Sequence, residues 1–219
     1  MDAHAFLDEN KRVTPPQLRN WCWALVETST GVTLLWVVAR ILPKQQPLLR
    51  GWTGMVGLIL LLHFGIFQVV ALFWRSVGVD APPIMSAPLR SRSLSEFWGK
   101  RWNLGFRQLA YDLVFGPLHK NLGVGMAGFL VFIFSGLIHD LVISVPAHGG
   151  YGLPTAYFAV QGLGVMVERS NVGRPLGLRK GISGRLFMAL LTAGPVFWLF
   201  HPPFVSHVII PFMNAIHAL

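Results

Sequence analysis

The sequence predicts an all-α integral membrane protein, a polytopic bundle of transmembrane helices. Hydrophobic residues make up 53% of its 219 residues and charged residues only 12%, whereas soluble domains carry about 25% charged residues. Long stretches also lack Asp, Glu, Lys and Arg altogether, namely 51–74, 122–138 and 186–219. Because a helix crosses the hydrocarbon core with roughly 20 apolar residues, these stretches are long enough to span a bilayer.

The apolar stretches and the aromatic residues beside them predict about six membrane passes. The expected passes are Trp21–Leu42, Trp52–Trp74, Leu122–Val145, Tyr151–Val167, Leu186–His201 and Phe204–Leu219, the last short enough for a re-entrant helix. Gly51, Gly54 and Gly57 have a spacing typical of close helix packing. The segment Trp102–Leu118 is less apolar and contains Arg107, so we expect an interfacial or partly inserted helix there.

The positive charges predict how the chain is oriented in its membrane. The basic segments Arg75–Arg101 and Glu168–Arg185 are separated by two passes that the uncharged turn Pro146–Gly150 joins. Basic loops tend to stay in the cytoplasm, so we expect both segments, and Met1–Arg19 with them, on the cytoplasmic face. The plasma membrane and the endoplasmic reticulum select similar spans, and the sequence does not separate them.

The composition also bears on domain organisation and on partners. We expect the whole chain, residues 1–219, to form a single membrane domain, and we make no prediction of its oligomeric state. The net charge of +9 is explained by the loops, and no groove of interleaved aromatic and basic residues predicts nucleic-acid binding. A lone cysteine, Cys22, excludes an internal disulfide and a cysteine-based metal pair.

The first candidate for chemistry is the tryptophan segment, Ser93–Asn103, which reads SLSEFWGKRWN. It combines Trp98 and Trp102 with the cations Lys100 and Arg101 at the edge of the membrane. Such cations can bind phosphates or a carboxylate, arginine through a fixed fork of donors. The alternative is an interfacial aromatic belt beside loop charges, and the residues alone leave both interpretations open.

The second candidate is the pair His139–Asp140, which lies deep in an apolar run. An ionisable residue at membrane depth indicates a functional site by default. Burial disfavours the charged form of imidazole, and a neutral imidazole is what a general base needs. Asp140 follows directly in the helix and therefore points away from His139. The alternative is a polar pair whose hydrogen bonds neighbouring helices satisfy.

The histidines allow a different class of function. His63, His139 and His201 lie on different expected passes, and imidazole is a common ligand of haem iron and of other metals. A haem-containing electron carrier therefore stays open as an alternative. So does a membrane protein that binds or transports lipids without catalysis.

Two motifs resemble a known family. The tryptophan segment is followed, in the next strong span, by Ser135-Gly136-Leu137-Ile138-His139-Asp140. This order is similar to that of the wax synthase branch of the membrane-bound O-acyltransferases, whose members carry S-L-x-x-F-W-G-[RK]-R-W-[NH] and then S-G-x-x-H-[ED]. The similarity covers roughly residues 88–169. Asp140 stands where many members have Glu, and this chain is shorter than most members.

The resemblance implies a fold like that of these enzymes and a fatty acyl transfer from acyl-CoA to the hydroxyl of a lipophilic alcohol, which gives an ester. His139 matches the family's membrane histidine, and Asn103 matches the polar residue that closes its tryptophan motif, so these two are the expected catalytic residues. The expected substrate-binding residues are Trp98, Lys100, Arg101, Trp102, Ser135 and Asp140. The expected partners are membrane lipids, the alcohol and acyl-CoA as co-substrate, with no metal and no other cofactor.

Overall fold

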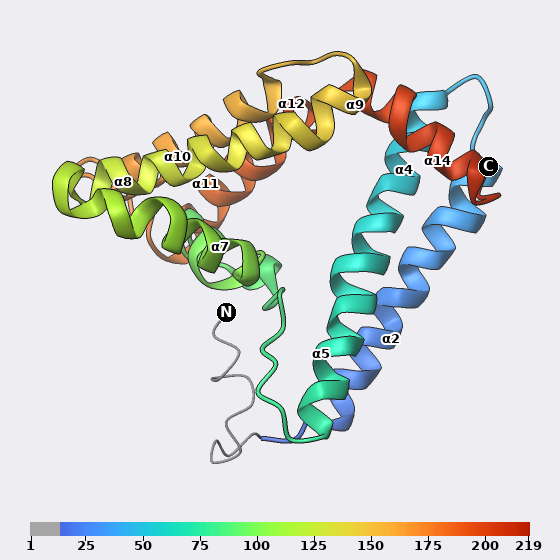
Figure 1. The fold of residues 1–219 in the computed structure, drawn as a ribbon, viewed down its shortest axis with the longest axis horizontal. Coiled ribbons are helices and arrows are strands. Elements are labelled where there is room, and N and C mark those ends of the chain that lie inside the picture. Colours follow the sequence, from blue (N-terminus) through green and yellow to red (C-terminus); the bar gives the residue numbers. More distant parts are fainter. Residues whose placement is uncertain (1–13) are drawn as a thin grey trace. The chain divides into compact units, whose positions relative to one another are not determined.

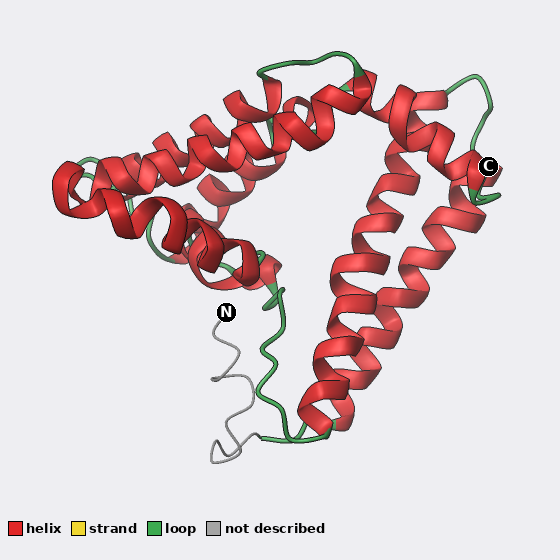
Figure 2. Ribbon diagram, in the orientation of Figure 1, coloured by secondary structure: helices red, strands yellow, loops and turns green. Residues whose placement is uncertain are grey.

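The computed structural model describes residues 14–219, which form helices joined by turns, with no β-strand in that range (Figure 2). The predicted all-α fold class is therefore confirmed. The contacts divide the chain into two compact units. Within the described residues, the first unit comprises 14–85 together with Ile209–Leu219, and the second comprises Ser86–Val208. The expectation of one membrane domain stays a prediction, and most of Met1–Arg19 lies outside the described residues.

The first unit contains two long helices (Figure 1). One runs from α2 (Leu18–Thr33) through the π-helical turn Leu34–Val38 into α3 (Ala39–Ile41), and the other runs from α4 (Pro47–Ile59) through the π-helical turn Leu60–Ile66 into α5 (Phe67–Ser76). The short helix α14 (Ile210–Ala215) belongs to the same unit. The two long helices correspond to the first two expected passes.

Glycines let the two long helices of the first unit approach each other closely. A Cβ atom on Gly31 would lie 2.7 Å from the backbone nitrogen of Leu61, and one on Gly57 would lie 2.9 Å from the carbonyl oxygen of Gly31. A Cβ on Gly54 would instead collide with the side chain of Met213 in α14. The predicted close packing thus holds at Gly57, where small residues allow backbone contact between helices.

The second unit is built from short and long helices around α10. Its helices are α6 (Leu94–Glu96), α7 (Leu104–Ala110), α8 (Gly116–His139), α9 (Val145–Ala147), α10 (Leu153–Arg169), α11 (Gly181–Ala193), α12 (Val196–Leu199) and α13 (Pro202–Phe204). A 3₁₀ turn, Pro88–Arg90, precedes them. π-Helical turns extend α6, α7, α8 and α13 over Phe97–Arg101, Tyr111–Phe115, Asp140–Ser144 and Val205–Ile209.

The long helical stretch Leu104–Ala147 folds back on itself at Gly123. This residue has φ 76° and ψ 163°, a conformation that glycine adopts readily and other residues avoid. Phe106 before the break stacks on Phe134 after it, with ring centroids 6.3 Å apart. The expected interfacial helix and the expected pass at Leu122–Val145 are therefore two arms of one helical hairpin (Figure 1).

Helix α10 lies against α8, α11 and α12 (Figure 1), and it also contacts α6. The backbones of α10 and α8 approach closely at Gly136, where a Cβ atom would lie 2.6 Å from the Cα of Thr155. One core cluster joins Ile143, Tyr157, Phe158 and Leu199, and another joins Leu94, Phe97 and Met188. α10 therefore serves as the central helix of the second unit.

Within the described residues, four helices are long and apolar enough to cross a membrane. They are Leu18–Ile41, Pro47–Ser76, Leu104–Ala147 and Gly181–Leu199. The passes expected at Tyr151–Val167 and Phe204–Leu219 correspond to shorter helices, of which α10 has 17 residues. The predicted count of about six passes therefore stays a prediction for those two segments.

Candidate active site

His139, at the end of α8, is held in one tautomer by its own helix. Its Nδ1 lies 2.6 Å from the carbonyl oxygen of Ser135. A carbonyl oxygen only accepts hydrogen bonds, so Nδ1 donates, and a neutral ring then keeps its lone pair on Nε2. Nε2 forms no hydrogen bond with a residue of the described range. The imidazole therefore offers a base at Nε2, at the start of a π-helical turn, a distortion that is frequent at functional sites.

Aromatic rings from two other helices contact the imidazole. The ring of Phe158 in α10 lies 4.5 Å from that of His139, centroid to centroid, at an interplanar angle of 44°. Phe106 in α7 meets it edge to face at 6.3 Å. The half-buried base thus stands in surroundings that suit an apolar ligand better than water.

Asp140 holds the N-terminus of α10. Its carboxylate accepts hydrogen bonds from the Ser144 hydroxyl at 2.8 Å, from the Gly152 N–H at 2.8 Å, and from both the N–H, at 3.1 Å, and the hydroxyl of Thr155. Helix N-termini favour such an anion because their first N–H groups lack partners within the helix. This geometry supports a role in placing α10, and the predicted contact of Asp140 with substrate stays a prediction.

The second motif therefore has a geometric explanation residue by residue. The carbonyl of Ser135 fixes the tautomer of His139, and Gly136 lets α10 approach α8. Asp140 then caps α10 from outside that helix. Together these contacts place Phe158 against the imidazole. The predicted contact of Ser135 with substrate is not tested by these contacts.

His201 completes the network at Asp140. Its Nδ1 accepts a hydrogen bond from the Phe204 N–H at 3.2 Å, so its Nε2 carries the hydrogen and donates to the Ser144 hydroxyl at 3.1 Å. Both ring nitrogens of this fully buried histidine are therefore engaged within the protein, which does not favour it as a haem ligand. No group of three or more metal-binding side chains occurs among residues 14–219.

The start of the tryptophan segment is fixed by the C-terminal end of α10. Glu168 is 1% exposed and accepts hydrogen bonds from the Leu94 N–H at 2.7 Å and the Ser95 N–H at 3.1 Å. The Nε of Arg169 donates to the Ser95 hydroxyl at 3.1 Å. From the sequence, Glu168 is interpreted as a buried acid that marks the end of a helix before Arg169. Nothing local signals that its partners lie 74 and 73 positions earlier in the chain.

The two cations of the tryptophan segment differ in their surroundings. Arg101 pairs with the Glu96 carboxylate at 2.6 Å and donates to the carbonyl of Ser86 at 3.1 Å. A hydrogen bond from the Arg92 N–H, with the Arg101 guanidinium beside it, lowers the pKa of Glu96. Lys100 is exposed and forms no ion pair within the described part of the chain. Of the two, Lys100 is therefore the better candidate for binding an anionic ligand.

Trp98 belongs to an aromatic cluster that reaches the imidazole. Its ring lies 5.5 Å from Phe158 and 5.9 Å from Phe132, so one ring separates it from His139. The indole Nε1–H donates to Oε1 of Gln161 at 3.2 Å. Trp102 stacks instead on Phe97 at 5.3 Å. Sequence reasoning did not identify Gln161.

Asn103 begins helix α7 in a left-handed conformation, φ 41° and ψ 62°, which asparagine tolerates better than most residues. Its Oδ1 accepts a hydrogen bond from the Phe106 N–H at 3.2 Å. The residue thus caps the helix that brings Phe106 to His139. In this side chain, Oδ1 serves as the cap and the amide nitrogen carries the hydrogen-bond donors.

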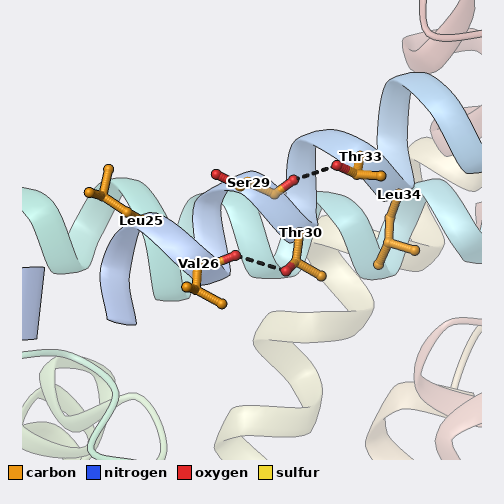
Figure 3. Close-up of a pocket in the computed structure, with 6 residues that line it drawn as sticks. All are labelled: Leu25, Val26, Ser29, Thr30, Thr33 and Leu34. Atoms are coloured by element: carbon orange, nitrogen blue, oxygen red, sulfur yellow. Dashed lines mark hydrogen bonds between the residues drawn. The ribbon is translucent and has the colours of Figure 1, made fainter. Parts of the chain in front are cut away.

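A separate hollow of about 420 Å³ lies on α2 in the first unit (Figure 3). It is lined by Leu25, Val26, Ser29, Thr30, Thr33 and Leu34. The hydroxyls of Thr30 and Thr33 donate to carbonyls of their own helix, at 2.8 Å each. No titratable side chain lines the hollow, so it has no group for acid–base chemistry.

Comparison with known proteins finds a similarity over the stretch that contains both motifs. Residues 81–159 match the model of the membrane bound O-acyl transferase family. The chain is 29% identical over 147 residues to a long-chain-alcohol O-fatty-acyltransferase of Simmondsia chinensis, covering 60% of this chain and 41% of that protein. It is 30% identical over 150 residues to a probable long-chain-alcohol O-fatty-acyltransferase 2 of Arabidopsis thaliana, covering 61% and 42%.

Another relative has a different acceptor in its name. The chain is 27% identical over 149 residues to acyl-CoA–sterol O-acyltransferase 1 of Arabidopsis thaliana, covering 58% of this chain and 39% of that protein. This chain thus spans about two fifths of the length of the curated relatives it matches. No solved structure matches it.

These findings confirm the resemblance that the sequence predicted. The matched residues contain both motifs, and the relatives are named as long-chain-alcohol O-fatty-acyltransferases. Together with the four apolar helices, the match supports an integral membrane protein. The cytoplasmic placement of the basic loops and the absence of a metal or other cofactor stay predictions.

Proposed function

We propose that this chain carries the acyl-transfer site of a membrane-bound O-acyltransferase that moves a fatty acyl group from acyl-CoA to the hydroxyl of a lipophilic alcohol. The observation that carries the proposal is the state of His139. Its Nδ1–H is committed to the Ser135 carbonyl, so its Nε2 is the basic nitrogen, and apolar rings contact it. The names of the relatives support the reaction class.

In the proposed reaction, His139 acts as the general base. An alcohol is a poor nucleophile at neutral pH, and a base within hydrogen-bond distance of its proton accelerates the attack by about 10² to 10⁴. Nε2 of His139 takes the proton while the alcohol oxygen forms a bond to the thioester carbonyl carbon. The carbon–sulfur bond then breaks, and the departing coenzyme A thiolate recovers the proton. The products are the ester and free coenzyme A.

Asn103 is the proposed donor to the charge that develops on the thioester oxygen. Its Oδ1 already caps the start of α7, so the side-chain amide that carries the donor nitrogen would be held in place before the reaction. A donor of this kind typically lowers the barrier by about 3–4 kcal/mol. The same cap positions Phe106 beside the base, which links both expected catalytic residues to one short helix.

The remaining expected contacts divide into an apolar and a charged group. The acyl chain and the alcohol would lie along the rings that lead from Trp98 through Phe158 to His139. Lys100, which is exposed and has no ion pair with residues 14–219, would meet the phosphates of acyl-CoA. Arg101 holds the tryptophan segment in place through its ion pair with Glu96. Because its guanidinium is already paired, Arg101 is a poorer candidate than Lys100 for binding the phosphates.

The test is ester formation in membranes that contain the chain, with labelled palmitoyl-CoA and a panel of long-chain alcohols and sterols. We expect product from the wild type and a loss of at least about 10²-fold in His139→Ala. The matched control is His207→Ala, because His207 also bonds a backbone carbonyl, that of Ala147 at 2.9 Å, and is exposed. That control should retain activity.

Two results would contradict the proposal. One is wild-type activity in His139→Ala. The other is no ester with any acceptor from protein that elutes as a folded species in detergent. In the second case, acyl-CoA binding without turnover would favour the non-catalytic lipid-binding alternative, and a Soret absorption band would favour the haem protein.

A further inference from the structure

We propose that Gln161, at the centre of α10, is a positioning residue that fixes Trp98 in the aromatic surface beside His139 and thereby tunes binding of the alcohol. This inference rests on the proposed function. It assigns a role to a residue outside both motifs, and outside the residues 81–159 that match the family model. It predicts a specific effect on acceptor binding and a smaller one on the chemical step.

The amide of Gln161 is fully buried and has a partner at each end. Oε1 accepts from the Trp98 indole N–H at 3.2 Å, and Nε2 donates to the carbonyl of Leu191 at 2.7 Å. An indole N–H can only donate and a carbonyl can only accept, so the orientation of the amide is determined by its partners. Removing such a partner leaves a buried polar group unsatisfied, which destabilises the protein. Both hydrogen bonds therefore resist rearrangement.

The carbonyl of Leu191 needs this donor because of Pro195. In a continuing α-helix the carbonyl of residue 191 would accept from the N–H of residue 195, and proline has no N–H. The amide of Gln161 supplies the missing donor from the neighbouring helix. The contact with α11 therefore holds the glutamine in place, and the glutamine in turn holds the indole.

Trp98 is the part of this arrangement that reaches the ligand. Its ring packs against Phe158, whose ring lies 4.5 Å from that of His139. If the indole lost its acceptor, it could rotate toward another partner, and the aromatic surface next to the base would change shape. The Nδ1 contact of His139 with Ser135 does not involve Gln161, so the base itself would stay in place.

The spacing along α10 supports this division of tasks. Phe158, Gln161 and Glu168 follow one another at intervals of three and seven residues, which places them on one face of a helix. They contact, in order, the imidazole, the indole and the start of the tryptophan segment. One face of α10 thus sets the relative positions of both motifs.

The experiment compares Gln161→Leu with wild type in the ester assay at varied alcohol concentration. We expect the KM for the alcohol to rise about tenfold while kcat stays within about threefold, because the base is untouched. The matched control is Tyr157→Phe. It removes a hydroxyl that also bonds α11, through the carbonyl of Thr192 at 3.1 Å, and leaves the bond to Trp98 intact. The control should keep the wild-type KM.

A double-mutant cycle with Trp98→Phe isolates the bond itself, because phenylalanine keeps an aromatic ring and lacks the N–H. In the Trp98→Phe background, Gln161→Leu should change KM by less than about twofold. An equal rise of KM in both backgrounds, a fall of kcat at unchanged KM, or an equal rise in Tyr157→Phe would overturn the inference.

The same four proteins of the cycle can be compared by thermal unfolding in detergent. This readout does not depend on turnover. If the unfolding effects of residues 98 and 161 are coupled but the wild type forms no ester, the hydrogen bond between the two side chains is supported. The proposed function, and with it the tuning of alcohol binding, is then rejected. Additive unfolding effects in an active enzyme would reject the bond and leave the proposed function standing.

Discussion

Both units pack helices closely at glycines, but they differ in the buried polar side chains that accompany this packing. In the first unit, the backbones meet at Gly31 and Gly57, and hydroxyls such as that of Thr30 bond to their own helix. In the second unit, buried or half-buried polar side chains join α10 to its neighbours. We call Asp140, Gln161 and Glu168 the polar anchors, because the side chain of each forms hydrogen bonds with one or two segments other than its own.

The difference has a physical reason. Small residues bring two helices together closely at little cost, which suffices where only the helices must stay paired. A polar side chain in an apolar environment is costly unless its partners are all in place, and the same requirement fixes its partners in direction as well as distance. The polar anchors occur where the base, the indole and the tryptophan segment need fixed relative positions.

The comparison predicts the largest effect at Asp140. Asp140→Ala removes the acceptor of two backbone N–H groups and two hydroxyls, and hydrogen bonds to a charged group contribute about 1.5–3 kcal/mol each. We expect a loss of roughly 3 kcal/mol or more in the free energy of unfolding, with little ester formed. Denaturant titration in detergent measures it, and Asp140→Glu should recover part of both. Unchanged stability in Asp140→Ala would remove the distinction between the units.

A smaller effect is expected in the first unit. Gly31→Ala places a methyl group against the backbone of the facing helix, and overpacking of this kind costs about 1–3 kcal/mol. Gly128→Ala is the control, since a Cβ there meets nothing within 4 Å. Thermal unfolding should separate the two variants. A stable Gly31→Ala protein would show that backbone contact does not hold this pair.

The smallest effect of the three should appear in Glu168→Gln. The amide keeps one acceptor oxygen for the N–H groups of Leu94 and Ser95 and loses only the assistance of the charge, which we expect to cost about 1 kcal/mol. We expect ester formation to fall by less than about tenfold, whereas Glu168→Ala should lose more. If Glu168→Ala formed ester as fast as Glu168→Gln, hydrogen bonding by residue 168 would contribute nothing to the site.

Most of the architecture could be predicted from the sequence because it depends on local composition. The first two long helices and the hairpin arm that carries His139 follow from runs of apolar residues, whereas the interfacial placement of Trp102–Leu118 stays a prediction. The role of Gly123 could not be predicted, because many glycines in the chain have similar neighbours and only the backbone angle singles it out.

The site was predictable only as far as its motifs extend. His139 and Asn103 stood out through their order along the chain, whereas Gln161 and Glu168 act through partners 30 to 74 positions away. Asp140 is a residue that could be identified from the sequence although its role could not. The sequence identified the residue, but whether its carboxylate faces a ligand or a neighbouring helix depends on tertiary contacts with Gly152 and Thr155.

The measurement that tests the account most directly is ester formation by His139→Ala, compared with wild type and with His207→Ala in the same membranes. The account predicts labelled ester from the wild type and from His207→Ala, and a loss of at least about 10²-fold in His139→Ala with unchanged expression and elution. Ester formation by His139→Ala at the wild-type rate would contradict the assignment of Nε2 as the base.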